Sequence, residues 1–185
     1  MTARIPPLAP ADRDERTEAL LATFRRSPDG PDMGIFATLA HHPKLLKKWS
    51  DFGGVLLYGG VLSGRDRELL ILRTGFLCGA DYEWGQHVVI GKACGLSDDE
   101  ILMLTKPIDQ AGWSAEDAAL IRAADELHVD YMISDATWAS LVPRYEAKGM
   151  IEICMVVGQY HLVAFTLNSL GVELDADIEG LPGLS

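Results

Sequence analysis

The feature that most constrains the fold is a series of helix start and stop signals along the chain. A serine is followed three residues later by an acidic residue at Ser63–Asp66, Ser97–Glu100 and Ser114–Asp117, and this spacing is typical of a helix N-terminus. No segment alternates between apolar and polar residues for long enough to predict a β-strand. The sequence therefore predicts an all-α protein.

Glycine and proline mark where the predicted helices end. Pro43 suits the first position of a helix, Asp81 is expected to cap the helix after Gly79, Pro143 is expected to kink or end a helix, and Gly171 suits the position after the last helix. The predicted helices cover residues 12–26, 43–58, 63–79, 81–95, 97–107, a segment opening at 114, 134–143 and 150–170.

The chain of 185 residues shows no repeat and no interdomain linker, so one domain over residues 1–185 is expected. Its three cysteines are odd in number, widely spaced and without a C-x-x-C motif. This pattern does not indicate a disulfide framework, and the N-terminus has no apolar signal segment. We therefore expect a cytoplasmic protein.

The net charge of −11 argues against nucleic-acid binding, which needs clustered Lys and Arg. It argues equally against an anionic membrane surface. The segment from Ile153 to Val172 has no formal charge and is long enough to span a bilayer. Gln159, His161 and Asn168 interrupt it, however, and no second span exists, so a core or interface helix is expected.

Glu83 and His87 are four residues apart and therefore share one face of a predicted helix. A carboxylate beside an imidazole fixes the ring tautomer, as general acid–base catalysis requires. Glu68 precedes the apolar run from Leu69 to Leu72, so its helix is expected to be largely buried. A buried carboxylate needs a partner, and His87 is a natural one.

Other polar residues are weaker candidates. Arg67 and Arg73 flank the buried face and could hold a substrate carboxylate. Tyr160 and His161 form a polar pair in the apolar last helix, where they need hydrogen-bond partners. Cys78 is expected to be a small buried residue rather than a nucleophile.

No metal site is expected. A set of Glu68, Glu83, His87 and His161 offers carboxylate and imidazole ligands, but the familiar catalytic spacings with two histidines are absent.

Three motifs carry a resemblance to a known family. They are Glu68-Leu-Leu-Ile-Leu-Arg73, Ala80-Asp-Tyr-Glu-Trp-Gly-Gln-His87 and Ala93-Cys-Gly-Leu-Ser-Asp-Asp-Glu100. Together with later segments such as Asp125-Glu-Leu-His128 and Val157-Gly-Gln-Tyr-His161, they resemble the carboxymuconolactone decarboxylase family over about residues 33–175. The resemblance implies the all-helical fold of the alkylhydroperoxidase D (AhpD) proteins, with about seven to eight helices, and assembly into trimers or hexamers.

The chain departs from the peroxidases of this family. Those members carry Glu, then C-x-x-C, then His, and the resemblance places these residues at Glu68, Ala80, Glu83 and His87. The two cysteines are therefore missing, and peroxide reduction by a dithiol is disfavoured. The resemblance leaves a decarboxylase-like enzyme that needs no cofactor.

The expected substrate is a small cyclic or lactone carboxylic acid, and the expected reaction is decarboxylation or a related lyase or isomerase step. His87 would shuttle the proton, Glu83 or Glu68 would orient it, and Arg73, Tyr82, Trp84 and His161 would contact the substrate. Two alternatives stay open: an AhpD-like peroxidase, and a non-catalytic oligomeric scaffold or ligand-binding protein.

Overall fold

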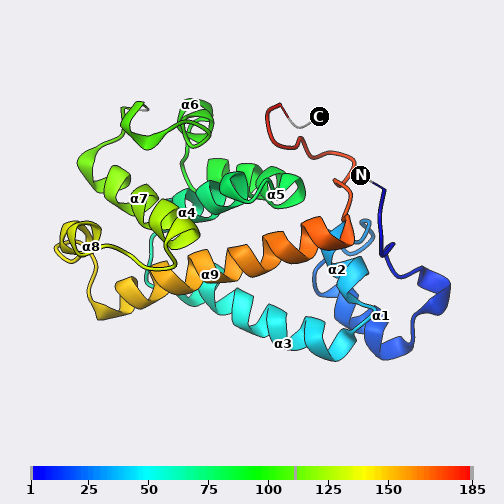
Figure 1. Cartoon of the computed structure of the whole chain (residues 1–185). Helices are drawn as coiled ribbons and strands as arrows, with labels where there is room; N and C mark the ends of the chain where they lie inside the picture. The colour runs from blue at the N-terminus through cyan, green and yellow to red at the C-terminus, as the bar shows by residue number, and fades with distance from the viewer. Residues whose placement is uncertain (1, 111, 184–185) are drawn as a thin grey trace.

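The computed structural model describes residues 2–110 and 112–183 of the chain, and within these ranges every regular element is a helix (Figure 1). The all-α prediction is therefore confirmed. The described α-helices are α1 (Glu15–Ala22), α2 (Gly34–Leu39), α3 (Pro43–Gly54), α4 (Gly64–Leu77), α5 (Asp81–Ala93), α6 (Asp98–Met103), α7 (Ala115–Val129), α8 (Asp135–Leu141) and α9 (Ala147–Leu170). Two short 3₁₀ turns, η1 (Pro10–Asp12) and η3 (Ile108–Gln110), and one π-helical turn, η2 (Val55–Gly59), complete them.

The predicted serine caps are present. Ser63, Ser97 and Ser114 each accept a hydrogen bond from the backbone N–H three residues later, and Glu100 completes a reciprocal capping box with Ser97. Pro43 occupies the first turn of α3, and Gly171 ends α9 with a φ of 67°. A left-handed residue of this kind is best tolerated as glycine.

Several predicted boundaries were wrong. The helix expected over residues 12–26 is a 3₁₀ turn followed by α1, which Asp14 caps. The residue that caps α5 is Ala80, while the carboxylate of Asp81 instead accepts a hydrogen bond from the backbone N–H of Leu181. The helix α2 was missed because it has only six residues and no side-chain cap.

Helix α4 forms the centre of the molecule and packs against α5, α7 and α9. Its residues Leu69, Leu70, Ile71 and Leu72 are completely buried, which explains a segment that is apolar on every side. Figure 1 shows α9 running the length of the molecule, from α8 at one end to the two chain termini at the other.

One helix, α9, is long and apolar enough to cross a membrane by length and composition, and half of its most apolar segment is buried inside the protein. Residues such as Ile153, Val157 and Ala164 belong to its buried side. This burial is typical of a core helix and is consistent with a soluble protein.

Candidate functional site

Glu68 and His87 meet in the core between α4 and α5. The Nδ1 atom of His87 lies 2.7 Å from Oε2 of Glu68, and the glutamate is completely buried. The other carboxylate oxygen, Oε1, accepts a hydrogen bond of 3.0 Å from Nε of Arg67. The buried carboxylate therefore has a partner on each oxygen, which offsets the cost of removing it from water.

The contact with Glu68 fixes the tautomer of His87. Because a carboxylate accepts hydrogen bonds, Nδ1 of His87 carries a proton and donates it to Glu68. The lone pair of a neutral ring then lies on Nε2, which has no hydrogen-bond partner within residues 2–110 and 112–183. The ring packs edge-on against Tyr160 of α9, with 4.8 Å between ring centroids. His87 is thus held in one orientation with one nitrogen free to accept a proton.

Glu83 lies one turn before His87 on α5 and is almost completely buried. Neither of its carboxyl oxygens has a hydrogen-bond partner in the described part of the chain. Gly75 of α4 makes room for it, since a Cβ atom there would lie 3.2 Å from Oε1 of Glu83. Burial raises the pKa of Glu83 well above 4.5, which favours the protonated, uncharged form of its carboxyl group.

Of the two glutamates expected to orient His87, Glu68 makes the contact and Glu83 does not. The site therefore holds a carboxyl group with a raised pKa, Glu83, and an imidazole of fixed orientation, His87, on the same face of α5. A carboxyl group whose pKa is raised by burial is typical of acid–base sites.

Arg73 is not available to a substrate. Its guanidinium forms two hydrogen bonds to the carboxylate of Asp125, at 2.6 and 3.0 Å, and two more to the backbone carbonyls of Leu104 and Lys106. These contacts fasten α4 to α7 and to the end of α6. The arginine that lies beside Glu68 is Arg67.

Tyr82 and Trp84 are buried and do not line an open pocket at His87. The hydroxyl of Tyr82 donates to Asp175 over 2.9 Å and accepts from the backbone N–H of Ile35 over 3.3 Å, so it holds the C-terminal segment and α2 together. Trp84 packs in the main core beside Phe76.

His161 also lies apart from the contact between Glu68 and His87. It follows Tyr160 in α9, and its ring points toward α7, where Nε2 lies 2.8 Å from Nδ1 of His128. Burial and the nearby His161 both lower the pKa of His128. Cys78 lies next to this histidine pair, and burial raises the pKa of its thiol to about 11.

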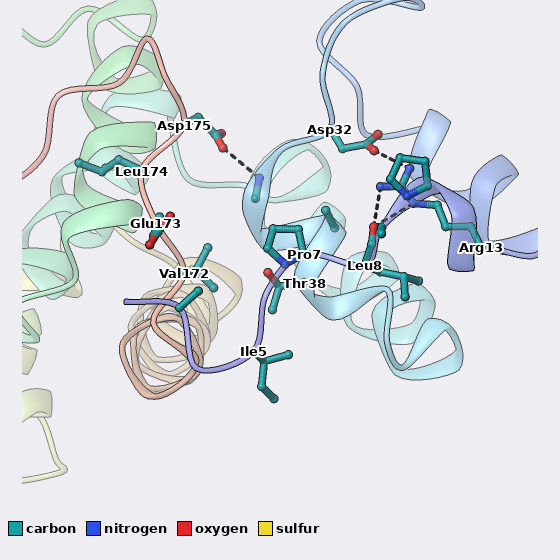
Figure 2. A pocket seen from close by; sticks show the side chains of 15 residues that line it. Ile5, Pro7, Leu8, Arg13, Asp32, Thr38, Val172, Glu173, Leu174 and Asp175 are labelled. Atoms are coloured by element: carbon teal, nitrogen blue, oxygen red, sulfur yellow. Dashed lines mark hydrogen bonds and ion pairs between the residues drawn. The ribbon is translucent and has the colours of Figure 1, made fainter. Parts of the chain in front are cut away.

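Two surface pockets lie away from the contact between Glu68 and His87. One, of about 430 Å³, is formed by the N-terminal segment, α2 and residues 172–175, with Asp175 on one side and the ion pair of Arg13 and Asp32 on the other (Figure 2). A second, of about 310 Å³, lies between α7 and α8. Neither is lined by Glu68, Glu83 or His87.

Sequence reasoning did not place Tyr160 against His87, nor His128 against His161. The one available signal was the polar pair Tyr160–His161 in an otherwise apolar helix, because buried polar groups need partners. Which of the two residues faces α5 and which faces α7 depends on the rotation of α9, and the sequence does not specify it.

Comparison with known proteins gives one family match and several similar folds. Residues 43–126 match the carboxymuconolactone decarboxylase family. A solved structure described as an alkylhydroperoxidase AhpD core, from Ralstonia eutropha JMP134, has a TM-score of 0.81 at 16% identity and covers 95% of this chain and 93% of its own. A peroxidase-related protein from Silicibacter sp. TM1040 has a TM-score of 0.80 at 14% identity, with 96% of each chain covered.

A third similar structure is the debrominase Bmp8 in complex with 2,3,4-tribromopyrrole, with a TM-score of 0.76, 13% identity, and coverage of 95% of this chain and 94% of that one. At such identities these likenesses show the fold alone. No curated protein matches the chain in sequence. The family match thus covers residues 43–126 of the chain, and the shared fold is that of the AhpD-like proteins.

Proposed function

We propose that this protein is an acid–base enzyme that transfers a proton to or from a small cyclic or lactone carboxylic acid. The observation that carries the proposal is His87, held by Glu68 with its Nε2 free, on the same helix face as the carboxyl of Glu83, whose pKa is raised. Proton transfer between such groups needs no cofactor.

Each residue has a separate part in this mechanism. In an elimination or isomerisation, Nε2 of His87 accepts a proton from a carbon of the substrate, and Glu68 positions the ring and stabilises the imidazolium that forms. Glu83 donates a proton to the carbon that keeps the electron pair when CO₂ leaves, or to the group that departs in an elimination. The guanidinium of Arg67, on the far side of Glu68, orients the carboxylate of the substrate.

The substrate needs a path to His87, and we propose that movement of η2 opens this path. This turn contacts α9, the helix that carries Tyr160, the residue that packs on His87. Gly53, Gly54, Gly59 and Gly60 flank or belong to η2. π-helical turns are rare and occur frequently at functional sites.

The test is turnover of a panel of lactone and cyclic carboxylic acids, followed by CO₂ release and by exchange of substrate protons in D₂O. We expect His87→Ala and Glu83→Gln each to lower kcat by about 100-fold or more, a typical contribution of a general acid or base. Arg122→Gln on the surface is the matched control. Full activity of His87→Ala would sink the proposal.

The pH profile separates the two roles. Glu83 must be protonated to act as an acid, so activity should fall as the pH rises through its raised pKa. In Glu83→Gln this alkaline decline should disappear from whatever activity remains. A decline that persists unchanged would remove Glu83 from the mechanism.

The peroxidase alternative receives no support from the thiols. Ala80 and Glu83 stand where the dithiol of the family peroxidases lies, and the pKa of Cys78 is raised to about 11, which disfavours a reactive thiolate. The non-catalytic alternative is favoured by one observation, since neither described pocket opens on His87. If the protein is non-catalytic, the wild type should show no turnover, and replacing Glu68, Glu83 and His87 together by apolar residues of similar size should cost little stability.

We also propose that the protein acts in the cytoplasm as a homo-oligomer, a trimer or hexamer, without nucleic acid or membrane partners. The three cysteines are free, as in reducing compartments. One face of α9 exposes apolar side chains at alternating spacings of four and three residues, at Ile151, Met155, Leu162 and Phe165, with Gly158 between them. This spacing is typical of a helix that packs along a second helix.

A further inference from the structure

A second cluster of reactive side chains lies outside the contact between Glu68 and His87. Cys78 at the end of α4, His128 in the last turn of α7 and His161 of α9 place one sulfur and two nitrogen atoms within 4.8 Å of one another. The two ring nitrogens are 2.8 Å apart, and the sulfur is 4.0 Å from Nδ1 of His128. Each of the three residues is partly exposed, so a small ion can reach them.

The tautomer of His161 is fixed by the backbone. Its Nδ1 lies 2.8 Å from the carbonyl oxygen of Val157, one turn earlier in α9. Because a carbonyl only accepts hydrogen bonds, Nδ1 carries the proton and Nε2 presents its lone pair to His128 and Cys78. A histidine that binds a metal usually donates its other ring N–H to a backbone carbonyl in this way.

The framework around the cluster is also fixed. The backbone carbonyl of Cys78 accepts a hydrogen bond of 2.9 Å from the side chain of Asn168, which ties the end of α4 to α9. The ring of His161 packs edge-on against Phe165, with 5.8 Å between centroids. Three helices therefore present the three ligand atoms, and none of them lies on a long loop.

We propose that Cys78, His128 and His161 bind one divalent transition-metal ion of the Zn²⁺ class. One thiolate and two imidazoles suit Zn²⁺ or Co²⁺, whereas Mg²⁺ and Ca²⁺ require oxygen ligands. In a tetrahedral zinc site the ligand atoms lie about 3.3–3.6 Å apart. The two nitrogens would separate by about half an ångström, and the sulfur would approach Nδ1 of His128 by about half an ångström and Nε2 of His161 by up to about 1 Å, which side-chain rotations allow.

The proton balance is simple. Without the ion, Nδ1 of His128 donates to Nε2 of His161, because the latter carries the lone pair. On binding, the ion takes the place of this proton, which moves to Nε2 of His128, and the thiol of Cys78 releases its proton to water. Three protein ligands leave the fourth position open to water or to an oxygen of a small molecule.

This inference is independent of the proposed acid–base reaction. The expectation of a metal-free protein was based on Glu68, Glu83, His87 and His161, whereas the cluster joins His161 to residues of two other helices. Only the folded chain brings Cys78, His128 and His161 together, because they lie far apart in the sequence.

The experiment uses the full-length protein after treatment with a chelator and a thiol reductant. Titration with Co²⁺ should give one equivalent of tight binding, with the visible bands of tetrahedral cobalt and a thiolate-to-cobalt charge-transfer band. Cys78→Ser should abolish the charge-transfer band, and His161→Gln should weaken binding by about 100-fold or more. Zn²⁺ should displace Co²⁺ and raise the Tm of the wild-type protein, because it binds the folded state.

Matched controls make the result specific. Cys154→Ser and His41→Gln remove a cysteine and a histidine outside the cluster and should leave the titration unchanged. His87→Ala should bind Co²⁺ as the wild type does, which separates this proposal from the acid–base site. Circular dichroism checks that each variant folds. Absence of stoichiometric binding to the wild type, or a charge-transfer band that survives Cys78→Ser, would overturn the proposal and leave a structural histidine pair.

Discussion

The buried Glu83 makes the free energy of unfolding depend on pH. Its carboxyl group is buried without a partner among the described residues, and its pKa in the folded state is raised well above the ordinary 4.5. Above that ordinary value, the unfolded chain loses a proton that the folded chain keeps. The free energy of unfolding therefore falls as the pH rises toward the raised pKa, by at most about 1.4 kcal/mol per pH unit.

Glu83→Gln should remove this loss of stability, because glutamine has a similar size and no proton to lose. Urea unfolding between about pH 5 and about pH 8 checks it: the variant should become increasingly more stable than the wild type as the pH rises. Glu116→Gln, at an exposed position, is the control and should follow the wild-type curve. Parallel curves for Glu83→Gln and the wild type would contradict an uncharged Glu83.

At this scale the sequence predicts contacts within a helix better than contacts between helices. That Glu83 and His87 share a face follows from the helical repeat alone. The contact between Glu68 and His87 could be anticipated only because a buried carboxylate needs a partner. The roles of Arg67 and Arg73 could not be distinguished, since both flank the same apolar run and only the packing of α6 and α7 determines which one is enclosed.

Among the helices, Arg73 joins α4 to two other elements. It links α4 to Asp125 of α7 and to two carbonyls at the end of α6. Arg73→Met should destabilise the fold by about 3 kcal/mol, because it leaves a carboxylate and two backbone carbonyls, one of them buried, without their donor. Urea unfolding monitored by circular dichroism measures the loss.

The matched control is Arg122→Met, which removes a surface ion pair with Asp109. That change should cost less than about 1 kcal/mol, since exposed pairs contribute little. A similar small cost for Arg73→Met would mean that Arg73 keeps contact with solvent and remains available to a substrate.

Helix boundaries were predictable where a side chain marks them. Ser63, Ser97 and Ser114 cap their helices as the motifs indicate. Helix α2 has no such mark, because its N-terminal residue Met33 offers no capping side chain. Asp81 was wrongly predicted to cap α5. Its carboxylate instead accepts a hydrogen bond from the backbone N–H of Leu181, a hundred residues away in the chain, and short-range patterns cannot reveal that contact.

At the scale of the whole molecule, the outer face of α9 is an apolar surface that we expect a second copy of the chain to cover. Ile151, Met155, Leu162 and Phe165 are between 43% and 63% exposed, and a continuous apolar strip of this kind is costly in water. Contact with the same strip of a second copy would bury it on both chains at once, as symmetric assembly allows.

Leu162→Glu places a charge in the middle of this strip and should therefore dissociate the assembly. Because Leu162 is half exposed in the single chain, the change should alter the stability of an isolated chain by less than about 1 kcal/mol. Light scattering coupled to size exclusion should show an oligomer for the wild type and a smaller species for the variant at the same concentration. Val89→Glu, an equally exposed apolar position on α5, should keep the wild-type mass. A wild-type monomer, or dissociation by both variants, would show that α9 is not the interface, because the effect would then not depend on the apolar strip.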